Sequence, residues 1–125
     1  MSLTFTAFVV RGRGRGKTIG TPTINLDPSV LTGIERQGIY AVWVTVDHER
    51  LPAVMHAGDR PVFNDDASVE IHFLVPPPVK TPQALTVKIV EFLRPIENFD
   101  SVEELQAQIR RDIEHARATL GIDAA

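Results

Sequence analysis

Short β-type segments, mostly joined by short connections, are the feature that most constrains what this chain can fold into. They are rich in β-branched and aromatic residues and are separated by turn-forming residues. Antiparallel strands can be joined by a simple turn, whereas parallel strands need a crossover of about a dozen residues or more, usually a helix. We therefore expect a mainly β, antiparallel barrel rather than a parallel α/β sheet. The segments cover residues 4–10, 38–46, 51–57, 68–75 and 85–93.

One helix is predicted, near the C-terminal end of the chain. Apolar residues recur there at steps of three or four and share one face, which should pack on the barrel. Ser101 and Glu104 have the spacing of a capping box at its start, and Gly121 is a typical stop. The apolar face consists of Val102, Leu105, Ile109, Ile113, Ala116 and Leu120. The opposite face, expected to be solvated, carries Glu103, Arg110, Arg111, Glu114 and Arg117.

Length and composition exclude several classes of protein. The chain has 125 residues, 43% of them hydrophobic, which suits a single domain spanning residues 1–125. Its formal net charge of −3 argues against a general nucleic-acid partner. It has no cysteine, which excludes disulfides and thiolate zinc sites and fits a cytoplasmic protein. No apolar run approaches the roughly 20 residues of a membrane span, so we expect no membrane partner.

A glycine-rich, basic segment at residues 10–26, VRGRGRGKTIGTPTINL, indicates a phosphate site. Glycines let backbone N–H groups crowd around an anion, and the basic side chains add positive charge. The segment is not a Walker A loop, because Arg11 stands where that motif needs glycine, and Gly20 and Pro22 prevent the helix that should follow. It is not a dinucleotide fingerprint either, because its third glycine would fall on Lys17.

Together these segments resemble the riboflavin kinase (flavokinase) family. The resemblance rests on VVRGRGRGK, IGTPTIN, QGIYAV, VEIHFL and FLRPIENFDSVEELQAQIRRDI, which follow in the family's order along nearly the whole chain. It implies a six-stranded antiparallel Greek-key barrel with a C-terminal helix. It also implies transfer of the γ-phosphate of ATP to the ribityl 5′-hydroxyl of riboflavin, giving FMN and ADP. In bacteria such a domain is commonly the C-terminal half of a bifunctional riboflavin kinase/FAD synthetase, whose adenylyltransferase half is not expected within these 125 residues.

The resemblance also assigns roles to individual residues. Thr23 and Asn25 would bind Mg²⁺ together with the nucleotide phosphates, and Glu70 would be the catalytic base that takes the proton of the flavin hydroxyl. Taken alone, Thr23 and Asn25 read as turn residues and Glu70 as a solvent-facing strand residue. His72 should share the face of Glu70, although a metal role for that pair would need further ligands. The residues expected around the nucleotide phosphates are Gly12, Gly16, Lys17, Gly20 and Pro22.

Three further residues, Arg94, Glu97 and Phe99, fall where the family contacts the flavin. Phe99 reads equally as a hydrophobic staple at the helix start. The segment VPPPVKTPQAL at residues 75–85 departs from the family, because it lacks the tyrosine that lies beside the nucleotide. A non-catalytic flavin- or nucleotide-binding regulatory module is therefore the alternative function. A small nucleic-acid-binding barrel is disfavoured by the acidic balance.

Overall fold

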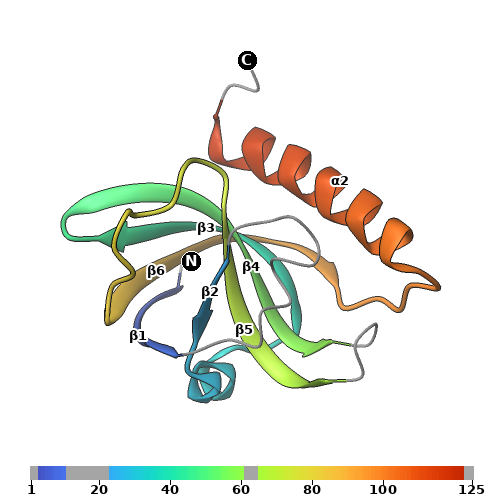
Figure 1. Cartoon of the computed structure of the whole chain (residues 1–125), viewed down its shortest axis with the longest axis horizontal. Coiled ribbons are helices and arrows are strands. Elements are labelled where there is room, and N and C mark those ends of the chain that lie inside the picture. The colour runs from blue at the N-terminus through green and yellow to red at the C-terminus, as the bar shows by residue number, and fades with distance from the viewer. Residues whose placement is uncertain (1–2, 11–22, 61–64, 123–125) are drawn as a thin grey trace.

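The described part of the chain forms a closed six-stranded barrel with the α-helix α2 laid across it (Figure 1). The structure, a computed structural model, describes residues 3–10, 23–60 and 65–122. The barrel order is β1-β2-β5-β4-β3-β6, and every neighbouring pair is antiparallel. β3, β4 and β5 lie side by side in chain order and β6 returns beside β3, which is a Greek-key arrangement. The elements are β1 (Leu3–Val10), β2 (Thr23–Leu26), the 3-10 helix η1 (Pro28–Gly33), β3 (Gly38–Val46), β4 (Glu49–Arg60), β5 (Asp65–Phe73), β6 (Ala84–Pro95) and α2 (Val102–Leu120).

The expected mainly β barrel with a C-terminal helix is confirmed, but the residue pattern missed β2 and η1. Thr23–Leu26 alternates between half-buried and buried positions, which is the period of a strand. Cross-strand pairing carries β4 to Arg60, beyond the expected range 51–57, and starts β5 at Asp65, before the expected range 68–75. Between β3 and β4, Asp47 and His48 form a turn with positive φ angles of 49° and 72°.

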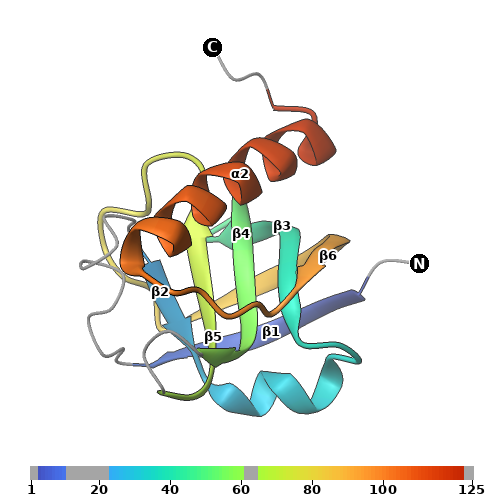
Figure 2. The same cartoon turned by 90° about the vertical axis from the view of Figure 1, so that its right-hand side faces the viewer.

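Two hydrophobic cores explain why β3 reads as an almost continuous apolar run. Successive strand residues point to opposite faces. Tyr40 and Val42 belong to the core inside the barrel, whereas Ile39 and Ala41 belong to a second core that includes Ala116 of α2. Figure 2 shows α2 lying over the outside of the barrel at this side. A strand buried on both faces needs apolar residues at consecutive positions.

The caps predicted for α2 are confirmed. Ser101 Oγ accepts a hydrogen bond from the Glu104 backbone N–H at 3.1 Å, and the Glu104 carboxylate accepts one from the Asp100 N–H at 2.9 Å. Gly121 has the left-handed conformation, with φ 72°, that ends many helices.

The expectation of a wholly solvated outer face on α2 is wrong at Arg117. Its side chain is half-buried and its Nη2 donates to the Leu74 carbonyl at 2.9 Å. That bond joins α2 to the end of β5, because a long cationic side chain can lay its stem along an apolar surface while its head finds an acceptor. Glu103, Arg110, Arg111 and Glu114 are exposed as predicted.

Candidate functional site

Two short strands bring four polar side chains to one patch on the outside of the barrel. In β2, Ile24 and Leu26 point into the barrel core, so Thr23 and Asn25 point outward. β2 pairs with β5 in the register that sets Asn25 opposite Glu70 and Thr23 opposite His72. Residues directly opposite on antiparallel strands have Cβ atoms about 4.5–5.5 Å apart. The predicted metal ligands and the predicted base are therefore neighbours.

Glu70 is the most deeply buried charged residue of this patch. Only 1% of its surface is exposed, and its Oε2 lies 3.7 Å from His72 Nε2. The two residues share a face, as strand alternation predicts, because Val69, Ile71 and Phe73 occupy the barrel core instead. A buried carboxylate is costly unless it has a polar or charged partner, and the His72 side chain lies beside Glu70. The solvent-facing reading of Glu70 is thereby excluded.

The patch continues across the sheet as one row of register partners. Asn25 pairs with Glu70, Glu70 with His56, His56 with Ile39, and Ile39 with Arg94. Each step crosses one strand spacing of about 4.8 Å. The row therefore links the predicted base to the predicted flavin-contacting arginine over three spacings, roughly 14 Å along the sheet.

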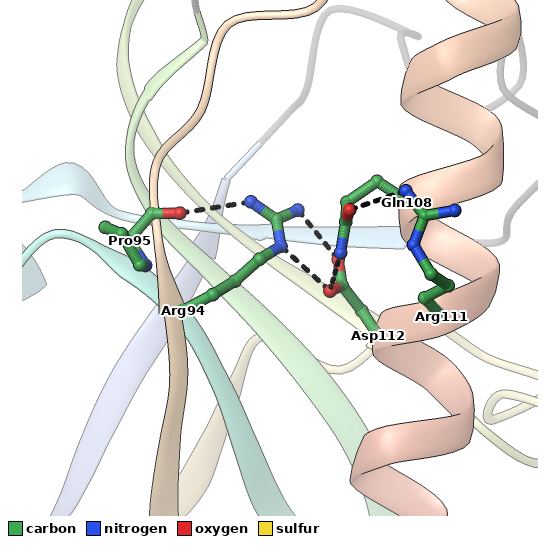
Figure 3. Close-up of polar contacts among 5 residues, drawn as sticks. All are labelled: Arg94, Pro95, Gln108, Arg111 and Asp112. Atoms are coloured by element: carbon green, nitrogen blue, oxygen red, sulfur yellow. Dashed lines mark hydrogen bonds and ion pairs between the residues drawn. The ribbon is translucent and has the colours of Figure 1, made fainter.

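Arg94, at the far end of the row, is held by a cluster of polar contacts between β6 and α2 (Figure 3). Its Nε and Nη2 donate to the two carboxylate oxygens of Asp112 at 2.8 and 2.7 Å. Its Nη1 donates to the Pro95 carbonyl at 3.1 Å. Gln108 Nε2 donates to Asp112 Oδ1 at 3.0 Å, and Arg111 Nη2 donates to Gln108 Oε1 at 2.8 Å. Three of the five guanidinium N–H groups are thus used within the chain.

The other two flavin candidates lie in the segment that joins β6 to α2. Phe99 is half-buried, and its ring centroid lies 5.8 Å from the guanidinium carbon of Arg94. Glu97 is exposed. Arg94 and Phe99 are thus brought together, while no contact within the described ranges links Glu97 to either of them.

The oxygens of Thr23 and Asn25 suit Mg²⁺. A hydroxyl and an amide carbonyl are the hard oxygen donors that this ion accepts, and both side chains are only half-buried, which leaves room for waters and phosphate oxygens. Across residues 3–10, 23–60 and 65–122, no three or more His, Cys, Asp or Glu side chains gather as a metal site. Thr23 and Asn25 as Mg²⁺ ligands therefore remain a prediction.

Five predicted residues lie outside the part of the chain that the structure describes: Gly12, Gly16, Lys17, Gly20 and Pro22. The sequence interpretation in turn missed Asp112, which is 5% exposed. A signal was present, because Asp112 stands three residues after Ile109 and four before Ala116, within the apolar stripe of α2. An acid in such a stripe needs a cation from another element.

Comparison with known proteins shows the family to which the chain belongs. The flavokinase family model, described as riboflavin kinase, matches residues 1–120. Human riboflavin kinase is 37% identical over 121 residues, which cover 90% of this chain and 77% of that protein. A bifunctional riboflavin kinase/FMN adenylyltransferase of Listeria monocytogenes is 33% identical over 112 residues, 88% of this chain and 36% of that protein. The fold resembles that of riboflavin kinase from Trypanosoma brucei, with a TM-score of 0.67 and 20% identity over 96% of this chain and 78% of that one. The chain belongs to the riboflavin kinase family.

Proposed function

We propose that this chain is a riboflavin kinase that transfers the γ-phosphate of ATP to the ribityl 5′-hydroxyl of riboflavin, giving FMN and ADP. Membership of the family supports the reaction. The observation that carries the residue assignment is the register of β2 on β5, which sets Asn25 opposite the buried Glu70. A metal-binding amide beside a carboxylate base suits the transfer of a phosphoryl group to an alcohol.

In the proposed reaction, Glu70 accepts the proton of the 5′-hydroxyl as its oxygen bonds to the γ-phosphorus. The bond between that phosphorus and the oxygen bridging to the β-phosphate breaks, and ADP leaves. Thr23 and Asn25 would hold Mg²⁺ through their side-chain oxygens, and the bound ion would offset the negative charge of the nucleotide phosphates. Glu70 and Arg94 lie three strand spacings apart, roughly 14 Å, and this separation suits an elongated acceptor, since riboflavin has a ring at one end and the reactive hydroxyl at the other.

Arg94 would contact the flavin through the two N–H groups that Asp112 and Pro95 leave unused. Phe99 would pack near the ring, and Glu97 would lie at its edge. The nucleotide phosphates would be bound by Gly12, Gly16, Lys17, Gly20 and Pro22.

We also propose that residues 1–125 act as one domain that works in the cytoplasm. No helix in the described ranges is long and apolar enough to cross a membrane. Two of the relatives are named bifunctional riboflavin kinase/FMN adenylyltransferase. Fusion of this chain to an adenylyltransferase domain in the full-length protein remains a prediction.

The test is to incubate the purified chain with riboflavin, ATP and Mg²⁺ and to measure FMN by chromatography, with EDTA and CTP in parallel samples. FMN that forms with ATP and is abolished by EDTA supports the proposal. If folded protein binds riboflavin but forms no FMN with either nucleotide, the non-catalytic flavin-binding module replaces it.

A further inference from the structure

The contact between Arg94 and Asp112 has a geometry that a purely stabilising ion pair does not need. The two N···O distances of 2.8 and 2.7 Å form a fork-to-fork pair, which fixes the plane of the guanidinium as well as its position. Both groups are largely buried, with side-chain exposures of 13% and 7%. Figure 3 shows the carboxylate of Asp112 facing the guanidinium across the gap between β6 and α2.

Asp112 is itself held in place by its own helix. Gln108, one turn earlier, donates to Asp112 Oδ1, and Arg111 donates to Gln108 Oε1. The carboxylate therefore has two donors on one oxygen and one on the other. Such a supporting network restricts the rotamers of the residue that it holds, which is how functional side chains are kept in a productive geometry.

The segment that the pair encloses carries the flavin candidates. Arg94 lies near the end of β6 and Asp112 near the middle of α2, so the ion pair closes a stretch of chain that contains residues 95–101. Arg94 also donates to the Pro95 carbonyl and lies 5.8 Å from the Phe99 ring. The orientation of the Arg94 side chain therefore affects both the backbone at Pro95, where the segment begins, and the position of the cation beside the Phe99 ring.

We propose that Asp112 is a positioning residue for riboflavin, acting through Arg94 and the segment at residues 95–101. This inference rests on the proposed function, and it deepens that function by adding a residue which no resemblance assigned. Asp112 orients the guanidinium, and the oriented guanidinium and Phe99 receive the flavin. Asp112 itself touches neither substrate.

The chain offers a matched control at a second contact between β6 and α2. Glu91 Oε2 lies 3.6 Å from His115 Nε2 and accepts from Thr119 Oγ1 at 3.4 Å. Glu91 thus joins the same two elements as Arg94 does, but away from the segment at residues 95–101. Glu91→Gln removes a charge from this exposed contact between β6 and α2 and leaves the Arg94 guanidinium undisturbed.

The experiment compares wild type, Asp112→Asn and Glu91→Gln by equilibrium dialysis with riboflavin, by steady-state kinetics and by thermal unfolding. Asp112→Asn keeps the size of the side chain and removes its charge. We expect its Kd and KM for riboflavin to rise about tenfold, the order of one lost hydrogen bond to a charged group, because a misplaced guanidinium loses a contact with the flavin, while its KM for ATP stays unchanged. Glu91→Gln should bind riboflavin as wild type does. Arg94→Lys, which keeps the charge but loses the fork, should weaken riboflavin binding as Asp112→Asn does, and the double variant should be no worse than either.

Two results would overturn the inference while leaving the proposed function intact. One is riboflavin binding by folded Asp112→Asn that equals wild type. The other is an equal loss in Glu91→Gln, which would show that any loosening of α2 suffices. A wild-type chain that binds no riboflavin at all would instead overturn the proposed function and this inference with it.

Discussion

At the scale of single residues, the proposed role of Glu70 is the most directly testable, because its carboxylate alone is proposed to accept the proton. Glu70→Gln keeps the shape of the side chain and its place opposite Asn25, but removes the base. We expect kcat to fall about 100-fold or more, which is the usual contribution of a general base, with little change in the binding of ATP. Steady-state FMN formation measures this, and Glu49→Gln, at an exposed position of β4, is the control. Near-normal kcat in Glu70→Gln would remove Glu70 from the mechanism.

The proposed role of Asn25 concerns the binding of Mg²⁺ and not the transfer of the proton. Asn25→Ala removes one oxygen ligand, and the loss of a polar contact to a charged group is worth about 1.5 kcal/mol or more, close to tenfold in affinity. We expect the Mg²⁺ concentration for half-maximal activity to rise by about this factor. A titration of activity with Mg²⁺ measures it, with Thr32→Ala on η1 as the control. An unchanged Mg²⁺ requirement would contradict the proposed ligand.

The sequence could predict a site residue where that residue belongs to a short sequence motif, and not where its role depends on a partner far away in the chain. Thr23, Asn25 and Glu70 each belong to a short motif of the family, so the sequence predicted a site from them, and the structure brings them together. Asp112 could not be found in this way, because its proposed role depends on its contact with Arg94, 18 positions earlier in the chain. Only the docking of α2 on β6 brings those two charges together.

At the scale of secondary-structure elements, α2 should depend measurably on its N-cap. Ser101→Ala removes the acceptor for the Glu104 N–H, while the bond from the Asp100 N–H to the Glu104 carboxylate remains. We expect a loss of about 1 kcal/mol in the free energy of unfolding, which lowers Tm by about 4 °C. Thermal unfolding followed by circular dichroism measures this. Thr81→Ala, at an exposed loop position, should leave Tm unchanged; equal shifts in both variants would show that the cap contributes nothing.

Elements were predictable where local pattern and tertiary contacts agree. α2 was found because its apolar residues repeat with the helical period, and β3 was found because it is a run of β-branched, aromatic and other apolar residues. β2 was missed because it has only four residues and follows a glycine- and proline-rich run that reads as a loop. Its pairing with β5 at four positions, and not its composition, makes it a strand.

At the scale of the whole molecule, the seam between β3 and β6 joins the barrel to the site. This seam contains two register shifts and ends where Gly38 pairs with Pro95. A Cβ on Gly38 would lie 2.5 Å from the Arg94 carbonyl oxygen and 2.5 Å from Phe92 Cε1. The close approach of two strands at this point needs a residue without a side chain. The close approach of β3 to β6 at Gly38 therefore also fixes the backbone position of Arg94.

Gly38→Ala should accordingly damage both stability and riboflavin binding. The added methyl group meets a backbone atom that cannot move without shifting β6, and overpacking of this kind costs about 1–3 kcal/mol. We expect a lower Tm together with weaker riboflavin binding, because the shift moves Arg94 away from the position set by Asp112. Gly33→Ala is the matched control, since a Cβ there meets nothing within 4 Å. Thermal unfolding and equilibrium dialysis on both variants measure the two effects. If Gly38→Ala lost stability but bound riboflavin normally, the barrel seam and the flavin segment would be mechanically independent, and the position of Arg94 would depend on α2 alone.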